Sequence, residues 1–174
     1  MKLFLKKYGI PLLGATIMCL LLFFLRKIQN LDFNTKEIFI MVSIFSSTLL
    51  IRTVDDIIDY KEDIRNNKKT FKIHLSYILG SLLLLIGIIM NMLSVQVIST
   101  LLFIIYVAYM TFAFYKKSRI LKIFIYPILI VVNFTQLMFI NNGLINYPIS
   151  IVYISILTIL TLSISIIFGI VKKG

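Results

Sequence analysis

Six apolar stretches run along this 174-residue chain, and they constrain its fold more than any other feature. We place them at residues 8–25, 37–54, 73–93, 95–115, 120–140 and 149–171. Each is close to the length of about 20 residues that a helix needs to cross a bilayer. Hydrophobic residues make up 60% of the sequence, which is more than a water-soluble domain usually contains. The sequence therefore predicts an all-α fold, a polytopic transmembrane helix bundle of about six spans, with residues 1–174 forming a single transmembrane domain.

Short polar segments separate these stretches. The third and fourth are divided only by a polar turn that we expect around Asn91 to Gln96. Asn141, Asn142 and Gly143 mark the turn before the sixth stretch, and Pro148 begins that stretch. Gly80 and Gly87 lie seven residues apart within the third stretch. Small residues at such spacing favour close contact between membrane helices.

The lysines and arginines predict the orientation of the bundle. If the N-terminus is cytoplasmic, only Arg26, Lys27 and Lys36 of the eighteen basic residues fall outside. The basic residues that then fall inside are Lys2, Lys6, Lys7, Arg52, Lys61, Arg65, Lys68, Lys69, Lys72, Lys116, Lys117, Arg119, Lys122, Lys172 and Lys173. The positive-inside rule therefore predicts a multi-pass protein of a bacterial cell membrane with both termini in the cytoplasm. Because the net charge of +11 is concentrated at the ends of spans, it indicates contact with anionic membrane lipid and no nucleic-acid partner.

Five of the seven acidic residues fall in one nine-residue window at the cytoplasmic end of the second stretch. They are Asp55, Asp56, Asp59, Glu62 and Asp63. Acidic residues at a bilayer boundary usually hold a cation or line a polar pathway. Because the four aspartates follow helical spacing, we expect them to share one face of a helix. This pattern predicts a Mg²⁺ site and, through Mg²⁺, a site for a phosphorylated ligand.

Basic residues surround this acidic window. Arg52, Arg65 and Lys68 flank or follow it, and Lys116, Lys117, Arg119 and Lys122 form a second basic cluster after the fourth stretch, on the same side of the membrane. Phosphate recognition commonly combines such cations with a bound metal ion. The alternative is a solvated charged loop, whose ion pairs contribute little. The regular period of the acids, and their start inside the apolar boundary, favour ligand binding.

The run Asp55-Asp56-Ile57-Ile58-Asp59-Tyr60-Lys61-Glu62-Asp63 resembles the first aspartate-rich motif of the UbiA superfamily of intramembrane prenyltransferases. That motif reads Asn-Asp-x-x-Asp-x-x-x-Asp, so Asp55 stands in place of the asparagine. In that family the motif also lies at the cytoplasmic end of the second span. Lys116 and Lys117 resemble a Tyr-x-x-x-Lys element of the family, with Phe112 at the tyrosine position.

The resemblance implies transfer of an isoprenyl group from a prenyl diphosphate, or another lipid diphosphate, to an acceptor. The family's bundle has nine helices, and two aspartate-rich motifs hold its Mg²⁺ cofactor. Carried over, the catalytic residues and metal ligands would be Asp55, Asp56, Asp59 and Asp63. Substrate binding would fall to Arg52, Arg65, Lys68, Lys116 and Lys117.

The second acidic motif of that family has no counterpart here, because no Asp or Glu follows Asp63. The chain therefore corresponds to about the first two-thirds of a UbiA-like bundle. Two functions remain open. One is a prenyltransferase that a second copy or a partner chain completes. The other is a non-catalytic relative that binds an isoprenoid or lipid diphosphate, or acts as a subunit or immunity-type factor.

Two amides in the fifth stretch, Asn133 and Gln136, lie three residues apart. Amides within membrane helices usually make interhelical hydrogen bonds. Lining a polar substrate cavity is the alternative role, and on that interpretation Asn133 joins the substrate-binding candidates. A transporter is a further alternative, but acids confined to one end of the bundle provide no polar path across it.

Overall fold

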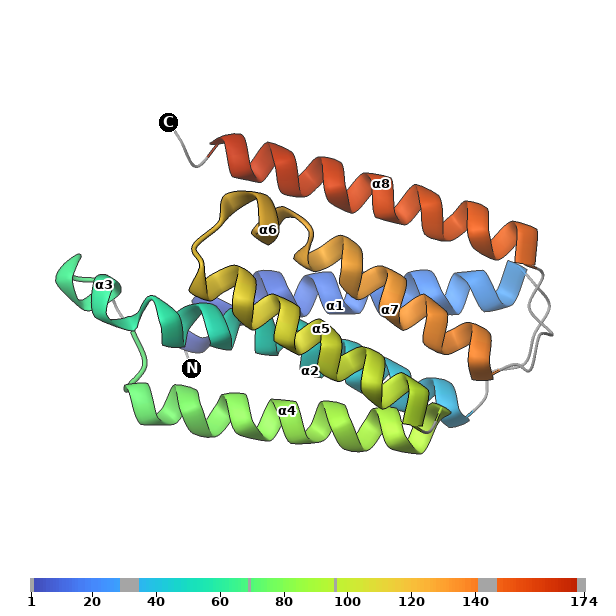
Figure 1. The fold of residues 1–174 in the computed structure, drawn as a ribbon, viewed down its shortest axis with the longest axis horizontal. Helices are drawn as coiled ribbons and strands as arrows, with labels where there is room; N and C mark the ends of the chain where they lie inside the picture. Colours follow the sequence, from blue (N-terminus) through green and yellow to red (C-terminus); the bar gives the residue numbers. More distant parts are fainter. Residues whose placement is uncertain (1, 29–34, 69, 96, 141–146, 172–174) are drawn as a thin grey trace.

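The computed structural model describes residues 2–28, 35–68, 70–95, 97–140 and 147–171, and within them every element is a helix. Six helices are long and two are short (Figure 1). In chain order they are α1 (Lys2–Ile28), α2 (Thr35–Ile58), α3 (Tyr60–Arg65), α4 (Ile73–Val95), α5 (Val97–Tyr115), α6 (Arg119–Ile123), α7 (Ile125–Ile140) and α8 (Tyr147–Val171). The all-α prediction is confirmed.

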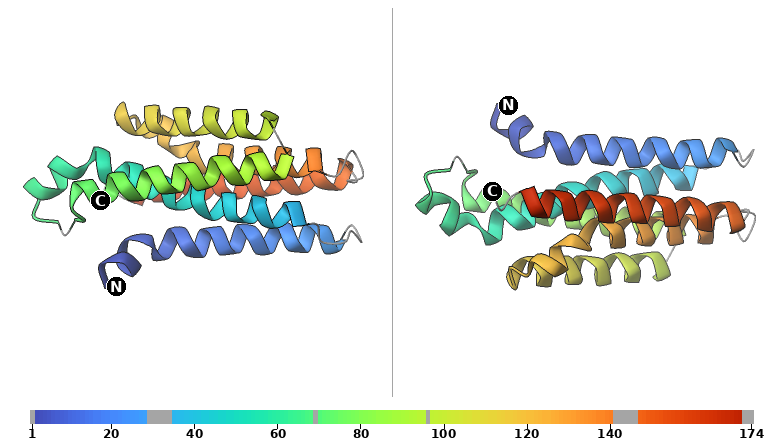
Figure 2. Two further views of the ribbon diagram at one scale, coloured as in Figure 1. Left: turned by 90° about the horizontal axis from the view of Figure 1, so that it is seen from below. Right: turned by 90° about the horizontal axis from the view of Figure 1, so that it is seen from above.

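The long helices lie side by side along the long axis of the molecule, with α2 at the centre (Figures 1 and 2). Helix α2 packs against α1, α4, α5 and α7. Its apolar span is 56% buried inside the chain, whereas that of α1 is 18% buried. Helix α2 is therefore the centre on which α1, α4, α5 and α7 assemble, while α8 packs on α7.

Two groups of buried apolar side chains hold the bundle together, and α2 contributes to both. In the first, Ile40 and Ile44 of α2 pack with Ala15 of α1 and Phe134 of α7. The second lies nearer the α3 end and includes Leu50 and Ile51 of α2, Leu83 of α4, Met110 of α5 and Leu129 of α7. Many apolar side chains on the outer faces of the helices are exposed. This arrangement suits a bundle surrounded by lipid.

Four helices in the described part of the chain are long and apolar enough to cross a membrane. These candidate spans are Lys7–Ile28, Thr35–Ile58, Ile73–Ser94 and Val97–Tyr115. Two shorter apolar helical segments, Ile125–Gln136 and Ile154–Ile166, occupy the places of the predicted fifth and sixth spans. The membrane character of the chain is thus supported, while six spans and their orientation stay predictions.

The predicted fifth stretch is not one helix, because it divides at Phe124 into α6 and α7. Pro127 explains the division. A proline has no N–H for the carbonyl four residues earlier, here that of Ile123, and its ring collides with that carbonyl in a continuous helix. In the first turn of α7 the same proline is tolerated, because the N–H groups there have no helical partner.

The prediction of a polar turn from Asn91 to Gln96 is wrong for Asn91–Val95. Helix α4 continues through Asn91 to Val95, and Gln96 lies outside the described residues. The Asn91 side chain is fully buried and joins three helices. Its Nδ2 donates to Ser43 Oγ of α2 at 2.8 Å and to the Gly87 carbonyl at 2.7 Å, while Ser99 Oγ of α5 donates to its Oδ1 at 2.8 Å. A buried amide that finds these partners is stable inside a helix.

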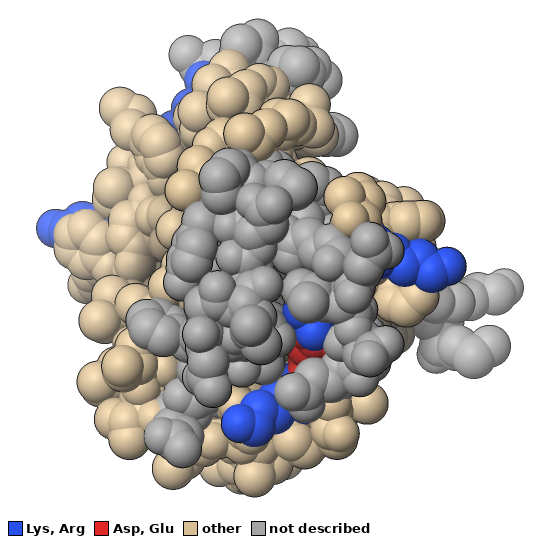
Figure 3. All heavy atoms as spheres, turned by 90° about the vertical axis from the view of Figure 1, so that its right-hand side faces the viewer, with Lys and Arg blue, Asp and Glu red and all other residues tan. Residues whose placement is uncertain are grey.

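The two ends of the bundle differ in their charges. Near the end of α1 and the start of α2, Arg26 and Glu37 form a buried ion pair with 2.6 Å between Nε and Oε1. Most of the described surface on the side of the molecule that faces the viewer in Figure 3 is neither acidic nor basic. The remaining described acidic residues lie at the opposite end, on the last turn of α2, at Asp59 and on α3.

The two glycines of α4 face different neighbours. A Cβ added at Gly87 would overlap the ring of Phe103 on α5, and that ring is buried. A Cβ at Gly80 would lie 3.4 Å from Cγ2 of Thr53 on α2, an ordinary contact. Only Gly87 is therefore required for close packing.

Gly87→Ala is expected to destabilise the protein relative to Gly80→Ala by about 1–3 kcal/mol, because overpacking a closed interface displaces the neighbouring side chain. Both variants gain the same helix propensity, so their difference isolates the clash with Phe103. Unfolding of the two purified variants in detergent would measure it. Equal stabilities would show that α4 and α5 are not in close contact at this position.

Candidate functional site

The acidic window folds as a helix that bends at Asp59. Helix α2 ends at Ile58 and α3 begins at Tyr60, and Asp59 between them has φ −88° and ψ 2°. Helical hydrogen bonds continue across the bend, from the Asp59 N–H to the Asp55 carbonyl at 2.9 Å and from the Asp63 N–H to the Asp59 carbonyl at 2.8 Å. The acids therefore keep their helical spacing while the chain leaves the bundle.

Asp56 is the buried member of the window. Its side chain is only 3% exposed and lies between two cations from different helices. Lys7 Nζ of α1 is 2.9 Å from Oδ2, and Arg52 Nη2 of α2 is 2.9 Å from Oδ1. A carboxylate removed from water in this way needs such compensation, because an isolated buried charge costs several kcal/mol, of order 3–5 when one partner is deleted.

Arg52 joins Asp56 to Asp55. Its Nη1 donates to Asp55 Oδ2 at 2.8 Å. The other oxygen of Asp55 faces Lys122 of α6 at 3.8 Å, and the side chain is 23% exposed. Charges thus alternate along a chain of contacts that runs from Lys7 through Asp56, Arg52 and Asp55 to Lys122.

Lys117 approaches the window from the other side. Its Nζ lies 2.5 Å from Glu62 Oε2 and 3.5 Å from Asp59 Oδ1. The hydrogen bond from Lys117 lowers the pKa of Glu62, and the same bond raises the pKa of Lys117. A carboxylate with a lowered pKa contributes stability above its ordinary pKa, and the contribution is lost as the pH falls through the lowered value.

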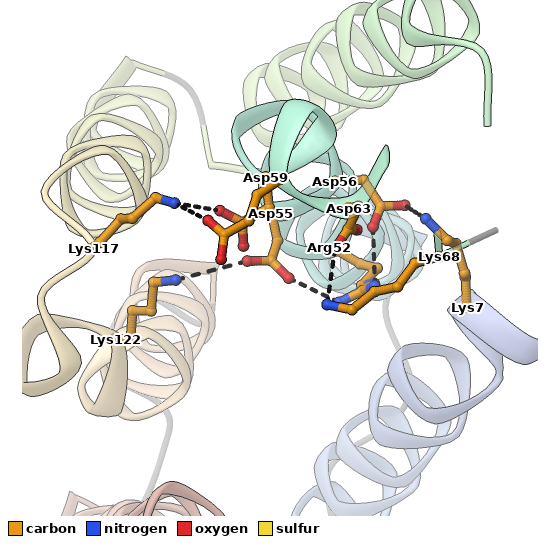
Figure 4. Close-up of polar contacts among 10 residues, drawn as sticks. Lys7, Arg52, Asp55, Asp56, Asp59, Asp63, Lys68, Lys117 and Lys122 are labelled. Carbon is orange, nitrogen blue, oxygen red and sulfur yellow. Dashed lines mark hydrogen bonds and ion pairs between the residues drawn. The ribbon is translucent and has the colours of Figure 1, made fainter. Parts of the chain in front are cut away.

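Asp63 completes the set with Lys68, whose Nζ lies 2.9 Å from Asp63 Oδ1. This bond raises the pKa of Lys68. We refer to the assembled residues as the charge cluster: Lys7, Arg52, Asp55, Asp56, Asp59, Glu62, Asp63, Lys68, Lys117 and Lys122 (Figure 4). Because its acids and its cations are equal in number, the cluster is formally neutral.

The kink of α1 brings Lys7 into the cluster. Pro11 cannot bond to the Lys7 carbonyl, and a helix usually bends at such a break. Figure 2 shows the first turns of α1 bent away from the rest of the helix. The bent segment is anchored by a contact of 3.1 Å between Tyr8 Oη and Thr53 Oγ1, and by Phe71, whose ring lies 5.7 Å from Lys7 Nζ.

The structure gathers most of the predicted site residues. Arg52, Asp55, Asp56, Asp59, Asp63, Lys68 and Lys117 all belong to the charge cluster. Three others do not. Arg65 is exposed on α3, Lys116 Nζ lies 5.9 Å from the Phe112 ring, and Asn133 donates to the Leu129 carbonyl inside the bundle at 2.7 Å. Whether these three contact a ligand stays a prediction.

Lys7 is the member that sequence reasoning assigned only to membrane orientation. The sequence contains one signal for this role. Lys7 lies four positions before Pro11 and is predicted on the same side of the membrane as the acids. Burial shows its role, because the Lys7 side chain is 10% exposed and its partner is Asp56.

Carboxylate oxygens are the donors that Mg²⁺ prefers, but the four aspartates do not converge. Figure 4 shows Asp55 and Asp59 turned toward Lys117 and Lys122, whereas Asp56 turns toward Lys7. No three acidic, histidine or cysteine side chains of the described residues are grouped as a metal site. Mg²⁺ is usually bound by one or two carboxylates together with substrate phosphates and water. The donors therefore fit an ion that is shared with a phosphate ligand better than one held by the protein alone.

Comparison of the chain with protein-family models, curated proteins and solved structures gives no match. The resemblance to the UbiA superfamily rests on the aspartate motif and its place in the order of helices. The features in hand define an all-helical bundle with candidate membrane spans and a neutral cluster of opposite charges at one end.

Lys117 also has a backbone that glycine would prefer, with φ at 51° just after α5. Lys117→Gly should therefore keep or raise the thermal midpoint while removing the cation beside Asp59 and Glu62. Lys116→Gly is the matched control, because position 116 has no positive φ and glycine there brings only added backbone freedom. Thermal unfolding of both variants would measure the difference, and a larger loss for Lys117→Gly would contradict the expectation.

Proposed function

We propose that this chain is a UbiA-like membrane protein that binds a prenyl diphosphate at the charge cluster, with Mg²⁺, and transfers its prenyl group to an acceptor. The observation that carries the proposal is the gathering of acids and cations from α1, α2, α3 and the α5–α6 region at one end of an apolar bundle. That combination matches a ligand with a doubly phosphorylated head and a hydrocarbon tail. The resemblance assigns the ligand the same end of the bundle.

The neutrality of the charge cluster supports a requirement for Mg²⁺. A diphosphate that entered alone would bring several negative charges into a site whose cations are already engaged by carboxylates. A diphosphate that enters with Mg²⁺ brings little net charge. Asp55 and Asp59 would then hold the metal ion, and their partners Lys122 and Lys117 would bind phosphate oxygens. Each released contact is replaced by one of the same kind.

The residues of the cluster then have separate tasks. Lys117, Lys122 and Lys68 would bind phosphate oxygens as point charges, and Arg52 would offer a planar fork. When bound, Mg²⁺ supplies neutralisation of the charge that the leaving diphosphate gains. Transfer would break the bond between the prenyl carbon and the diphosphate oxygen, which keeps the electron pair. It would join that carbon to the acceptor, which releases a proton. The apolar bundle next to the cluster would hold the tail and limit access of water to the reacting carbon.

The orientation belongs to the same proposal. Six spans with both termini in the cytoplasm would place the charge cluster on the cytoplasmic side, where soluble diphosphates and Mg²⁺ are available. The distribution of basic residues in the sequence supports this topology. A second copy or a partner chain would supply the second acidic motif.

Geranyl diphosphate should bind the purified protein in detergent only when Mg²⁺ is present. Asp59→Asn should weaken this binding by about tenfold or more, since it removes a charged contact of roughly 1.5–3 kcal/mol. Glu62→Gln is the matched control, because Glu62 lies in the same window and also pairs with Lys117 but is not a motif position. Calorimetry with and without a chelator would measure both effects. Binding that survives the chelator, or that Asp59→Asn leaves unchanged, would contradict the proposal.

A non-catalytic relative is the second candidate function. It is favoured by one observation: each acid of the charge cluster already has a cation within 2.5–3.8 Å, so the cluster is compensated without a ligand. Such a protein would bind the diphosphate and release it unchanged. Incubation with radiolabelled geranyl diphosphate and cell membranes as a source of acceptor separates the two functions. Labelled product indicates transfer, and recovery of intact diphosphate from a protein that binds it indicates the non-catalytic relative.

The proposed orientation is tested by cysteine labelling in a Cys19→Ala background. Asn66→Cys, beside α3, should react with a membrane-impermeant maleimide only after cells are permeabilised, because it is expected in the cytoplasm. Thr35→Cys, at the start of α2, should react in intact cells. Both positions are exposed on the protein, so burial does not bias the comparison. If Asn66→Cys reacts in intact cells and Thr35→Cys reacts only after permeabilisation, the proposed orientation is wrong.

A further inference from the structure

The carboxylates of the aspartate motif differ in their access to a ligand. The Asp56 side chain is 3% exposed, and both of its oxygens face cations at 2.9 Å. Asp55 and Asp59 are 23% and 30% exposed. A metal ion that reached Asp56 would have to displace Lys7 or Arg52 from a nearly dry position. Asp55 is held closely at one oxygen only, by Arg52 at 2.8 Å, and its other oxygen lies 3.8 Å from Lys122. Asp59 lies 3.5 Å from Lys117, and water reaches both carboxylates.

Asp56 is also the point at which α1 is attached to the charged end of α2. The ion pair with Lys7 crosses 49 residues of sequence, and the contact between Tyr8 and Thr53 lies beside it. Phe71, which precedes α4, packs near both Lys7 and Tyr8. Loss of the Asp56 charge would therefore loosen three segments at once.

Arg52 carries the effect of Asp56 to Asp55. Its two terminal nitrogens are divided between the two carboxylates, with Nη2 on Asp56 and Nη1 on Asp55. Without the Asp56 charge, Arg52 would be left with Asp55 as its only acidic partner among the described residues. Its positive charge would then act more fully on the carboxylate proposed to meet Mg²⁺.

We infer that the motif divides into ligand-binding and positioning residues: Asp55 and Asp59 contact the Mg²⁺–diphosphate ligand, while Asp56, held by Lys7, positions Arg52 and α1. The inference rests on the proposed function for its ligand, and it differs from the resemblance, which assigns all four aspartates to the metal. The attachment of α1 through Lys7 and Asp56 does not depend on any ligand.

Two measurements on the same variants test the inference. The first is the thermal midpoint of the purified protein without ligand. The second is the Mg²⁺ concentration that gives half-maximal binding of geranyl diphosphate at saturating diphosphate. The variants are Asp55→Asn, Asp56→Asn and Lys7→Met, the combination of the last two, and Lys7→Arg as the charge-preserving control.

Asp56→Asn and Lys7→Met should each lower the thermal midpoint by about 5–10 °C, because each removes one partner of a buried pair. The double variant should lose much less than the sum of the two, because the two residues act on one interaction. Lys7→Arg should retain most of the wild-type midpoint. If the losses of Lys7→Met and Asp56→Asn simply add, the attachment of α1 through this pair is wrong.

The half-maximal Mg²⁺ concentration distinguishes a residue that positions Arg52 from one that binds the metal ion. Asp56→Asn should raise the half-maximal Mg²⁺ concentration by about threefold, because a negative charge is lost and Arg52 acts more fully on Asp55, as expected for a partly screened interaction. Lys7→Met should not raise it, because it removes a positive charge and leaves Asp56 as a partner of Arg52. Asp55→Asn should raise it by about tenfold or more, since a carboxylate ligand is lost. If Asp56→Asn raises the half-maximal Mg²⁺ concentration by about tenfold, Asp56 is a metal ligand and the inference is wrong. If it leaves that concentration unchanged, Asp56 does not position Arg52, and the inference is also wrong. If Asp56→Asn does not fold, Lys7→Met and Lys7→Arg report on the same contacts.

Failure of the proposed function is distinguishable from failure of this inference. If wild-type protein does not bind geranyl diphosphate with Mg²⁺, the proposed function and the ligand-binding half of the inference both fall. The thermal cycle between Lys7 and Asp56 would still decide the attachment of α1. If wild-type protein binds and Asp55→Asn binds equally well, only the division of the motif is wrong.

Discussion

A carboxylate at the edge of an apolar bundle must have its charge balanced where it lies, and Asp56 shows how much structure that requirement determines. Burial removes the water that would otherwise solvate the charge, so cations must come from the protein. One cation, Arg52, is supplied by the preceding turn of the same helix, and the other by a helix 49 residues away. The bent start of α1 and the packing of Phe71 near Lys7 hold that second cation beside Asp56.

The sequence predicted the helices well because their signals are local. Apolar stretches of near-constant length locate the long helices, and the observed ends differ from the predicted ones by a few residues at most positions. The errors have identifiable causes. Pro127 divides the fifth stretch because it cannot bond to the carbonyl four residues earlier. Asn91 is a common turn residue, but here its side chain is hydrogen-bonded to Ser43 and Ser99 inside the bundle. Propensity describes a residue alone, whereas burial and hydrogen bonding depend on neighbours distant in sequence.

The candidate site was predictable in composition and less so in geometry. Helical spacing identified the aspartates, and the positive-inside rule predicted Lys117 on their side of the membrane. Spacing cannot show which way each carboxylate turns once other helices approach. Helix α1 draws Asp56 to one side, and the α5–α6 region draws Asp55 and Asp59 to the other (Figure 4). A motif that reads as four equivalent acids along the chain is thereby separated in space into acids with different surroundings.

The hydrogen bonds of Asn91 have a consequence for the rotation of α4. A helix that is apolar on all sides has little reason to prefer one rotation about its axis in a lipid environment. Asn91 removes that freedom, since its amide meets Ser43 and Ser99 in only one rotational setting. Gly87 lies one turn earlier, and the same setting turns its bare backbone toward the Phe103 ring. One polar side chain thus selects the angular register of α4, and the close approach of α5 depends on that selection.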